Sequence, residues 1–253
     1  MTVSDTNVIT QSLVQRIERK FYLPPLKVGF AFGQLKHLCR FDEEYPSEQI
    51  NSLYFDTPEL EQYEKSSSGD YKKDKVRIRW YGKDNVCQSL QTAYIELKSR
   101  RGFASAKQRL KIQISAEQLA LDNLGQGIVP KIMLLNTLCT FGYFPLEPLQ
   151  PVIKISYWRY RFQEAITGQH VSLDYNIRST MIMPGHGNGI IDLKLPGGVI
   201  EIKSTGLELP ATFRFMKILD LDWSRYSKYS ACIDSHDEKP GTVGYLSPSG
   251  KII

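Results

Sequence analysis

Apolar and charged residues alternate along three consecutive segments between residues 75 and 114. Val76, Ile78 and Trp80 are separated by cationic residues, and the same period of two recurs at residues 95–98 and 109–114. This period is typical of β-strands that bury one face. Because turn-forming residues such as Gly82 and Gly102 separate the three segments, we predict an antiparallel arrangement.

Further strands and helices are predicted on both sides of these three strands. The other strands are expected at residues 50–55, 152–162, 171–175, 190–195 and 199–203. Apolar residues at helical spacing predict helices within residues 26–40, 115–143 and 210–219. Many antiparallel strands with helices at their sides predict a single α+β domain.

Composition narrows the class of protein but does not identify a ligand. The 253 residues include 32 Lys and Arg against 27 Asp and Glu, and 42% of the residues are hydrophobic. This is ordinary globular usage, and a net charge of +5 is too small to identify an anionic partner. We expect no direct membrane insertion, because no apolar run approaches the roughly 20 residues that span a bilayer. We expect a cytoplasmic protein, because the N-terminus does not resemble a secretory signal and no disulfide framework is indicated. The four cysteines are widely spaced, which argues against a disulfide framework or a zinc site.

The charged faces of the predicted strands allow two interpretations. Arg77 and Arg79 share one strand face, and Glu201 and Lys203 share another. They could belong to the solvated face of an antiparallel sheet. Alternatively, a closed barrel could turn its polar faces inward, where Arg side chains bind phosphate in a bidentate manner. Such a lumen would need an anionic ligand and a divalent metal held by the carboxylates, and a triphosphate with Mg²⁺ or Mn²⁺ meets both needs.

Nine short motifs resemble, in the same order, those of the VTC (vacuolar transporter chaperone) polyphosphate polymerase domain. The first is R-x-E-x-K at residues 16–20, which is also related to the start of the wider triphosphate tunnel metalloenzyme or CYTH-like superfamily. The other motifs lie at residues 52–57, 75–82, 95–98, 107–109, 157–159, 171–174, 199–203 and 227–229. The resemblance therefore extends over nearly the whole chain.

The resemblance implies a fold and domain boundaries. The implied fold is an antiparallel β-barrel of the α+β class, a triphosphate tunnel with a polar lumen and flanking helices. In that lumen Arg77, Arg79, Lys98 and Glu201 would lie together. We expect an N-terminal segment at residues 1–15, the VTC-like domain at residues 16–233, and a C-terminal tail at residues 234–253.

The resemblance also implies roles for individual residues. Basic positions that would line the tunnel and take part in catalysis are Lys20, Arg77, Arg79, Lys98, Lys107, Arg109, Arg159 and Lys228. Further substrate-binding positions are Lys203, Ser227, Tyr157 and Arg178. Glu201 matches the metal-binding carboxylate, and Glu18, Glu96 and Asp174 are candidates for the metal or for holding Lys and Arg side chains in place. His170 stands where the family usually has an Arg.

The implied activity is transfer of the γ-phosphoryl group of ATP, or of another nucleoside triphosphate, to a growing inorganic polyphosphate chain with Mn²⁺ or Mg²⁺. One alternative is a triphosphatase of the same superfamily, with water as acceptor. Another is a non-catalytic polyphosphate- or phosphate-binding module, which His170 favours. We expect no nucleic-acid binding, because the cations are dispersed through strands and no basic amphipathic helix occurs. Any membrane association would require a separate partner protein.

Overall fold

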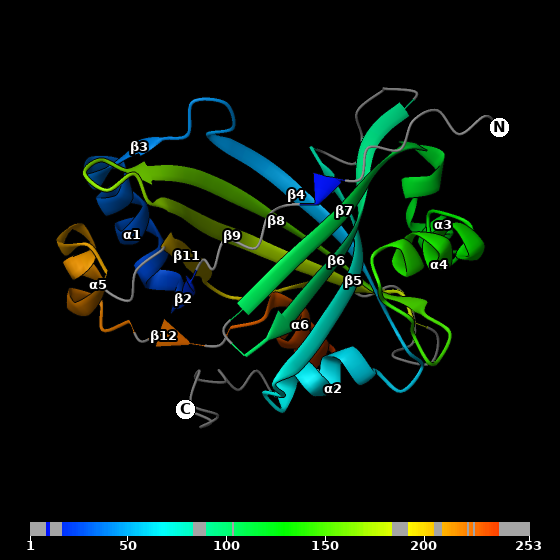
Figure 1. The fold of residues 1–253 in the computed structure, drawn as a ribbon. Helices are drawn as coiled ribbons and strands as arrows, with labels where there is room; N and C mark the ends of the chain where they lie inside the picture. The colour runs from blue at the N-terminus through cyan, green and yellow to red at the C-terminus, as the bar shows by residue number, and fades with distance from the viewer. Residues whose placement is uncertain are drawn as a thin grey trace. The chain divides into compact units, whose positions relative to one another are not determined.

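The computed structural model divides the chain into two compact units. It describes residues 9–10, 17–82, 90–102, 104–183, 192–204, 209–221, 223–224 and 226–237 (Figure 1). Unit 1 comprises Met1–Val14, Ile50–Ile155 and Thr180–Asp192, and unit 2 comprises Gln15–Gln49, Ser156–Ser179 and Leu193–Ile253.

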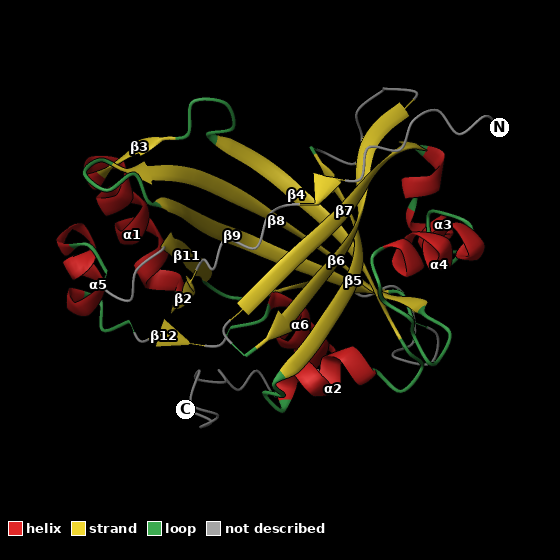
Figure 2. Cartoon of the chain, in the orientation of Figure 1, coloured by secondary structure: helices red, strands yellow, loops and turns green. Residues whose placement is uncertain are grey.

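Unit 1 contains long antiparallel strands. In spatial order they are β1 (Ile9–Thr10), β7 (Ala104–Ser115), β6 (Leu90–Arg101), β5 (Lys72–Tyr81), β4 (Ser47–Asp56) and β8 (Gln150–Glu164), which also runs into unit 2 (Figure 2). The predicted turn between β6 and β7 includes Gly102, whose φ is 58°. Glycine adopts this left-handed conformation without the steric penalty of other residues.

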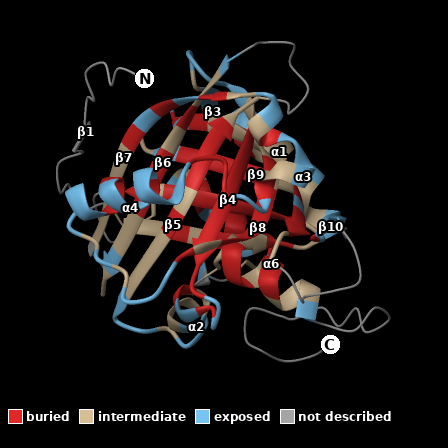
Figure 3. Cartoon of the chain, turned by 90° about the vertical axis from the view of Figure 1, so that its right-hand side faces the viewer, coloured by how far each residue is buried: buried red, intermediate tan, exposed pale blue. Residues whose placement is uncertain are grey.

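Helices pack on the apolar face of the unit 1 strands. They are the 3₁₀ helix η1 (Glu117–Leu119), α3 (Leu121–Leu124) and α4 (Lys131–Thr140), while α2 (Glu61–Ser67) follows β4. Trp80 and Ile95 of the strands pack in one core with Leu124 of α3 and Leu138 of α4. Exposed residues are concentrated on the outer sides of the helices and in loops (Figure 3).

The buried carboxylate of Asp56 ends β4 and fixes the start of α2. Its two oxygens accept hydrogen bonds from the backbone N–H groups of Thr57, Gln62 and Tyr63. The N–H groups at a helix start have no partner within the helix, so a carboxylate there stabilises the first turn. The predicted strand end at this position is therefore confirmed.

Unit 2 contains a second set of antiparallel strands. In spatial order they are β8, β9 (His170–Met181), β11 (Gly198–Ser204), β2 (Ile17–Leu23) and β12 (Trp223–Ser224). In addition, β3 (Cys39–Phe41) pairs with β8 and β10 (Asp192–Lys194) pairs with β9. The helices are α1 (Pro25–Leu38), the 3₁₀ helix η2 (Ala211–Arg214), α5 (Phe215–Ile218) and α6 (Lys228–Asp237).

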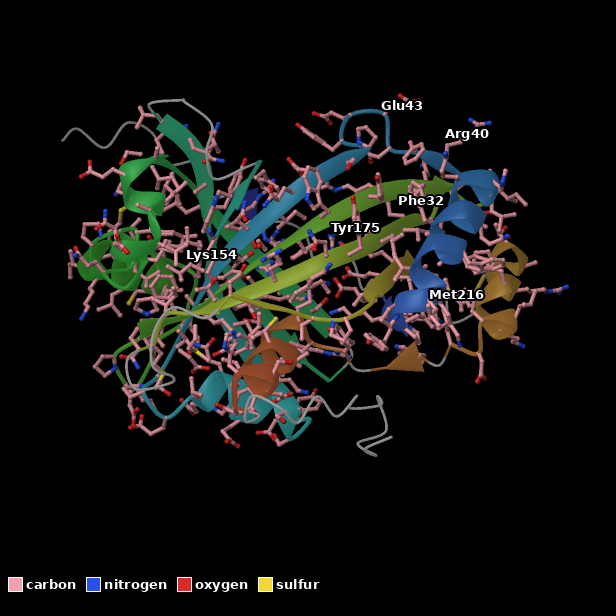
Figure 4. All side chains as sticks on the ribbon, turned by 180° about the vertical axis from the view of Figure 1, so that it is seen from behind. Phe32, Arg40, Glu43, Lys154, Tyr175 and Met216 are labelled. Carbon is pink, nitrogen blue, oxygen red and sulfur yellow. The ribbon has the colours of Figure 1, made fainter. Side chains whose placement is uncertain are left out.

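The core of unit 2 joins α1 and α5 to the apolar face of its strands. Met216 of α5 belongs to the same buried cluster as residues of α1, β2, β9 and β11. Phe32 of α1 contacts Tyr160 with ring centroids 4.5 Å apart, and Tyr160 stacks on Tyr175 at 5.3 Å. Figure 4 labels Phe32 and Tyr175. Pro25 suits the start of α1, because proline pre-sets the helical φ angle and needs no N–H partner there. The helices α1 and α5 therefore cover the apolar face of these strands, and the polar face carries the charged side chains.

The predicted α+β class, with an antiparallel sheet and flanking helices, is confirmed. Among the described strands the hydrogen-bonded order is an open path from β1 to β12, so closure into a barrel stays a prediction. Arg77, Arg79 and Lys98 belong to unit 1 and Glu201 to unit 2, and their common lumen also stays a prediction. At the C-terminal end, α6 extends to Asp237, beyond the expected start of the tail at residue 234.

None of the helices in the described part of the chain has the length and apolar character needed to cross a bilayer.

Gly197 is expected to tolerate no side chain. Its φ is 76°, and a Cβ atom there would lie 2.0 Å from the carbonyl oxygen of Leu23. We expect Gly197→Ala to lower the free energy of unfolding by more than about 1 kcal/mol. Gly29 of α1 has open space around it, so Gly29→Ala should instead raise that free energy by about 0.5–1 kcal/mol. Urea denaturation of the two variants measures both values, and a Gly197→Ala protein as stable as wild type would contradict the argument.

Candidate functional site

The polar face of the unit 1 strands carries seven cations in three rows. Residues directly paired between antiparallel strands lie on the same face of a sheet. The rows across β5, β6 and β7 are Lys75, Lys98 and Lys107; Arg77, Glu96 and Arg109; and Arg79, Tyr94 and Lys111. Seven cations therefore surround a single carboxylate within these rows. Such a face repels itself electrostatically and favours anionic ligands.

Glu96 is the centre of this arrangement and is fully buried. One of its oxygens accepts a hydrogen bond of 2.8 Å from Nε of Arg77, and the other lies 2.5 Å from Nζ of Lys107. Nε of Arg79 is 3.9 Å from the carboxylate. Each of these contacts fixes a cation on the polar face. We infer that Glu96 holds Arg and Lys side chains in place, the second of the two roles predicted for it.

Hydroxyl groups of β4 complete the positioning of the two arginines. Nη1 of Arg77 donates to the hydroxyl of Tyr54 at 3.0 Å, and Nε of Arg79 donates to the hydroxyl of Ser52 at 3.1 Å. Arg109 lies over the ring of Tyr94, with 4.9 Å from the guanidinium carbon to the ring centroid. Ser52 and Tyr54 lie in one of the recognised motifs, but sequence reasoning gave them no role. Because Ser52 and Tyr54 are two residues apart on a predicted strand, the sequence indicates that they share one face of the sheet.

The crowded cations lower the pKa of Glu96 and, together with burial, the pKa of Lys107. Burial alone would raise the pKa of Glu96, but Arg77, Arg79 and Lys107 outweigh it and hold that pKa well below its usual range. Burial, together with Arg79 and Arg77, lowers the pKa of Lys107 to about 7, although Glu96 opposes this shift. The charge of Lys107 therefore changes near neutral pH.

Binding of a phosphate anion beside Lys107 should take up a proton at pH 8. An adjacent anion raises the pKa of an ammonium group, so a neutral Lys107 would become charged on binding. We expect calorimetric titration with tripolyphosphate, in buffers of different ionisation enthalpy, to show uptake of up to about one proton more by wild type than by Lys107→Arg. The arginine stays protonated in both states. Equal uptake by the two proteins would contradict a neutral Lys107 that gains its charge on binding.

The polar face of the unit 2 strands has a more balanced charge. Its rows across β2, β11 and β9 are Glu18, Lys203 and His170; Lys20, Glu201 and Ser172; and Tyr22, Val199 and Asp174. In the first two rows an acidic residue of one strand is paired with a lysine of the next, Glu18 with Lys203 and Glu201 with Lys20. This face therefore brings together carboxylates and cations, as a site for a metal-bound phosphate requires.

Asp174 is fully buried and binds two cations. One of its oxygens accepts from Nε of Arg159 at 2.6 Å and the other from Nη2 of Arg159 at 2.7 Å, which is a bidentate pair. Nζ of Lys228, the first residue of α6, lies 2.5 Å from the same carboxylate. Arg159 and Lys228 also lie over the ring of Tyr157. Asp174 thus fixes one cation from β8 and one from α6, and acts as a holding residue like Glu96.

Mutual attraction keeps this buried trio charged. Burial alone would raise the pKa of Asp174, but Arg159 and Lys228 outweigh it and lower that pKa. Burial opposes the charge of Arg159, yet Asp174 raises its pKa well above the usual value. Burial also opposes the charge of Lys228, and Asp174 again raises its pKa. The trio therefore remains an ion-pair network throughout the neutral range.

Glu201 is the carboxylate of this face that best suits a metal. Two of its ion-pair distances, 3.8 Å to Arg159 and 3.7 Å to Lys203, are longer than hydrogen bonds. Within the described part of the chain, no group of three or more acidic, His or Cys side chains is placed to hold a metal ion. Mg²⁺ is usually bound by only one or two carboxylates together with phosphate oxygens of the substrate. Glu201 therefore fits a metal that arrives with a phosphate ligand.

A cavity of about 220 Å³ opens on this face. The residues that line it are Asp42, Arg159, Arg161, Phe162, His170, Val171, Ser172, Glu201 and Lys203. Arg161 was not among the predicted site residues. Its Nη2 donates to Glu48 at 2.7 Å and its Nη1 to the carbonyl oxygen of Tyr45 at 3.2 Å. It therefore stands as a fixed cation in the cavity wall.

The predicted site residues thus fall into two groups, one in each unit. Lys98, Lys107, Arg109 and Glu96 join Arg77 and Arg79 on the unit 1 face, and the remaining predicted residues belong to unit 2. Ser227 and Arg178 lie outside the three rows of the unit 2 face. Ser227 precedes α6, where its hydroxyl accepts from the N–H of Ser230 at 3.3 Å, as an ordinary helix cap does. Arg178 is exposed on β9, beyond the segment that pairs with β11.

The chain matches one protein-family model and is similar to several solved structures. A family model described as the VTC domain matches residues 15–236. Among solved structures, a putative adenylate cyclase from Bacillus halodurans is 18% identical, with 84% of this chain and 93% of that chain covered and a TM-score of 0.47. A putative adenylate cyclase from Vibrio parahaemolyticus is 12% identical, with 87% and 97% covered and a TM-score of 0.35. No relative was found among curated proteins. Since both TM-scores are under 0.5, the family assignment rests on the family model.

Proposed function

Because the chain belongs to the VTC domain family, we propose that it is a polyphosphate polymerase that transfers the γ-phosphoryl group of ATP to inorganic polyphosphate. In this reaction the bond between the γ-phosphorus and the β,γ-bridging oxygen breaks. A new bond forms from the γ-phosphorus to an oxygen of the acceptor's terminal phosphate. The products are ADP and a chain longer by one phosphate.

The observation that supports this proposal most directly is the excess of cations on the unit 1 face. The solvated face of an ordinary sheet needs no excess of cations. On the unit 1 face, Glu96 is the only carboxylate within the three rows. Phosphoryl transfer requires mainly in-line positioning and neutralisation of the charge on the transferring group. Arg77, Arg79 and Lys107, fixed by Glu96, would bind the triphosphate and neutralise it.

The residues of unit 2 fit the metal that such a reaction uses. Glu201 would hold Mn²⁺ or Mg²⁺ together with phosphate oxygens. When bound, the metal neutralises charge on the phosphates and orients them. Arg159 and Lys228 are held by Asp174, so they would present fixed positive charge to a phosphate without first reorganising.

The test is incubation of the protein with ATP, polyphosphate and Mn²⁺, followed by separation of polyphosphate, orthophosphate and ADP. We expect one phosphate to be added to polyphosphate for each ADP released. Orthophosphate as the sole phosphate product would favour a triphosphatase. Binding of polyphosphate without release of ADP under Mn²⁺ or Mg²⁺ would favour a binding module.

Arg79→Lys separates recognition of phosphate from a general effect of charge. Lysine keeps the charge but lacks the planar donor fork of arginine, so a surface that relies on charge alone should be insensitive to the change. Loss of one charge-assisted hydrogen bond of about 1.5–3 kcal/mol should lower kcat/KM for ATP by roughly ten- to a hundredfold. The matched control is Arg214→Lys, because Arg214 is exposed on η2. Similar kcat/KM values in the two variants would refute phosphate recognition by Arg79.

A further inference from the structure

The polar face of the unit 1 strands becomes uncharged beyond the row that contains Arg79. The next positions on this face, each two residues further along its strand, are Tyr81, Thr92 and Gln113. Leu90, two residues from Thr92 on the same face, is 57% exposed. At the opposite end of the strands Lys73 is paired with Arg100, so the positive charge continues there. The face is therefore cationic at one end and neutral at the other.

A nucleoside triphosphate has the same division into a charged and a neutral part. Its phosphates are polyanionic, whereas its base is uncharged, with apolar ring faces and polar edges. Electrostatic attraction draws the phosphates to the cation-rich rows. Proteins bind bases by stacking them on aromatic rings and by hydrogen bonds to their edges. The neutral end of this face offers both kinds of group.

Tyr81 supplies an aromatic ring at the boundary between the charged and the neutral rows. Its ring contacts that of Tyr94, with centroids 6.1 Å apart and an angle of 73° between the ring planes. Such an edge-to-face contact is a preferred arrangement of aromatic pairs, so Tyr94 orients the ring of Tyr81. Arg109 lies over the Tyr94 ring and occupies one of its faces. Tyr81 is therefore the member of the pair better placed to stack on a base.

Side chains from both neighbouring strands fix the end of β5 that carries Tyr81. Nδ2 of Asn51 donates to the carbonyl oxygen of Gly82 at 2.8 Å, and Nε2 of Gln91 donates to the carbonyl oxygen of Tyr81. Asn51 belongs to β4 and Gln91 to β6. The strand end is therefore held in place before a ligand arrives, and this lowers the entropic cost of binding.

Gln113 offers a hydrogen-bond donor and an acceptor in the same row. Its Nε2 donates to the hydroxyl of Thr92 at 3.1 Å, which restrains the amide. An amide carries two N–H donors and a carbonyl acceptor, so this bond uses one donor of an exposed side chain. A glutamine amide bonds N6 and N7 of adenine as a pair, whereas guanine presents two acceptors on the corresponding edge. Gln113 therefore favours adenine over guanine.

We propose that the neutral end of the unit 1 face binds the adenine base of ATP, with Tyr81 stacking on the base and Gln113 bonding its edge. The proposal rests on the proposed function, which supplies ATP as the ligand. It also gives the direction of the nucleotide along the face, with the γ-phosphate farthest from Tyr81. Substitution of either residue should therefore change the affinity for ATP and leave the affinity for a phosphate chain unchanged.

The first test compares a ligand that has a base with one that lacks it. A non-hydrolysable ATP analogue and tripolyphosphate are titrated calorimetrically into wild type, Tyr81→Ala, Gln113→Ala and Tyr71→Ala. Tyr71 is the matched control, because it is 73% exposed and precedes β5 at the cationic end of the face. Tyr81→Ala and Gln113→Ala should bind the analogue about tenfold more weakly and tripolyphosphate as wild type does. Wild-type affinity for the analogue in both variants, equal weakening of both ligands, or a loss confined to Tyr71→Ala would overturn the proposal.

The second test measures the choice between bases. Wild type should bind the adenine analogue about tenfold more tightly than the corresponding guanine analogue, and Gln113→Ala should bind the two with similar affinity. Gln126→Ala is the control and should keep the preference, because Gln126 is an exposed glutamine between α3 and α4. A wild-type protein without a preference, or a preference that persists in Gln113→Ala, would overturn the role of Gln113.

Both tests measure binding, so they separate the adenine site from the polymerase function. If the variants lose affinity for the analogue alone while wild type releases no ADP in the turnover assay, the polymerase function fails and the adenine site is supported. If wild type lengthens polyphosphate while Tyr81→Ala and Gln113→Ala bind both ligands as wild type does, the adenine site fails and the polymerase function stands.

Discussion

Glu201→Gln is expected to abolish metal-dependent release of ADP from ATP while leaving the protein folded. The amide keeps the shape of the side chain but loses the charge that a divalent cation requires. Two ion-pair contacts of Glu201, at 3.7 and 3.8 Å, are longer than hydrogen bonds, so their loss should cost less stability than the loss of a hydrogen-bonded buried pair. The expected result is a rate at the background of the assay with Mn²⁺ or Mg²⁺.

The matched control is Glu117→Gln, an exposed position in η1 of unit 1, which should keep the wild-type rate. Titration of Mn²⁺ into wild type and into Glu201→Gln adds a readout that does not depend on turnover. Retention of metal-dependent turnover by Glu201→Gln would remove Glu201 from the metal assignment.

Asp174→Asn is expected to cause the largest loss of stability among the variants considered. The substitution removes the negative charge that compensates Arg159 and Lys228, and leaves two poorly exposed cations facing each other. Removal of one partner from a buried ion pair typically costs about 3–5 kcal/mol. Urea denaturation should show this decrease in the free energy of unfolding, whereas Asp122→Asn, at an exposed position in α3, should show almost none.

The pH dependence of stability gives an independent check on Asp174. Its pKa is lowered in the folded protein, so the ion pairs stabilise the fold above the unfolded-state pKa of about 3.9. This stabilisation is lost as the pH falls below that value. The difference in unfolding free energy between wild type and Asp174→Asn should therefore be constant from pH 5 to 7 and shrink below about pH 4. A difference that does not change with pH would mean that packing, not charge, explains the effect.

Much of the fold could be predicted from the spacing of apolar and polar residues along the sequence. The strands of unit 1 were placed correctly because Val76, Ile78 and Trp80 bury one face and leave the cations on the other. The strands β1 and β12 were missed, because two residues are too few to show a period. Residues 190 and 191 of the predicted strand at 190–195 lie outside the described residues, and Asp192–Lys194 form β10.

The candidate site was harder to predict, because it depends on which strands pair and in what register. The sequence shows that Glu96 and Asp174 are acidic residues on strands, but a strand carboxylate can hold a metal, a cation or water. Only the pairing places Glu96 among Arg77, Arg109 and Lys107, and Asp174 against Arg159. Arg161 was missed for a similar reason, because its partner Glu48 is more than a hundred residues away in the sequence.

The crowding of cations around Glu96 makes the free energy of unfolding depend on the anions that bind to the protein. Like charges held on one face of unit 1 raise the free energy of the ligand-free protein, and any bound polyanion lowers it again. Ligands that bind only the folded state shift the unfolding equilibrium in proportion to their concentration and affinity. Under the proposed function, the lifetime of this protein in a cell would then follow the supply of triphosphates and polyphosphate. Starvation for phosphate would reduce both the substrates of the proposed reaction and the amount of folded protein.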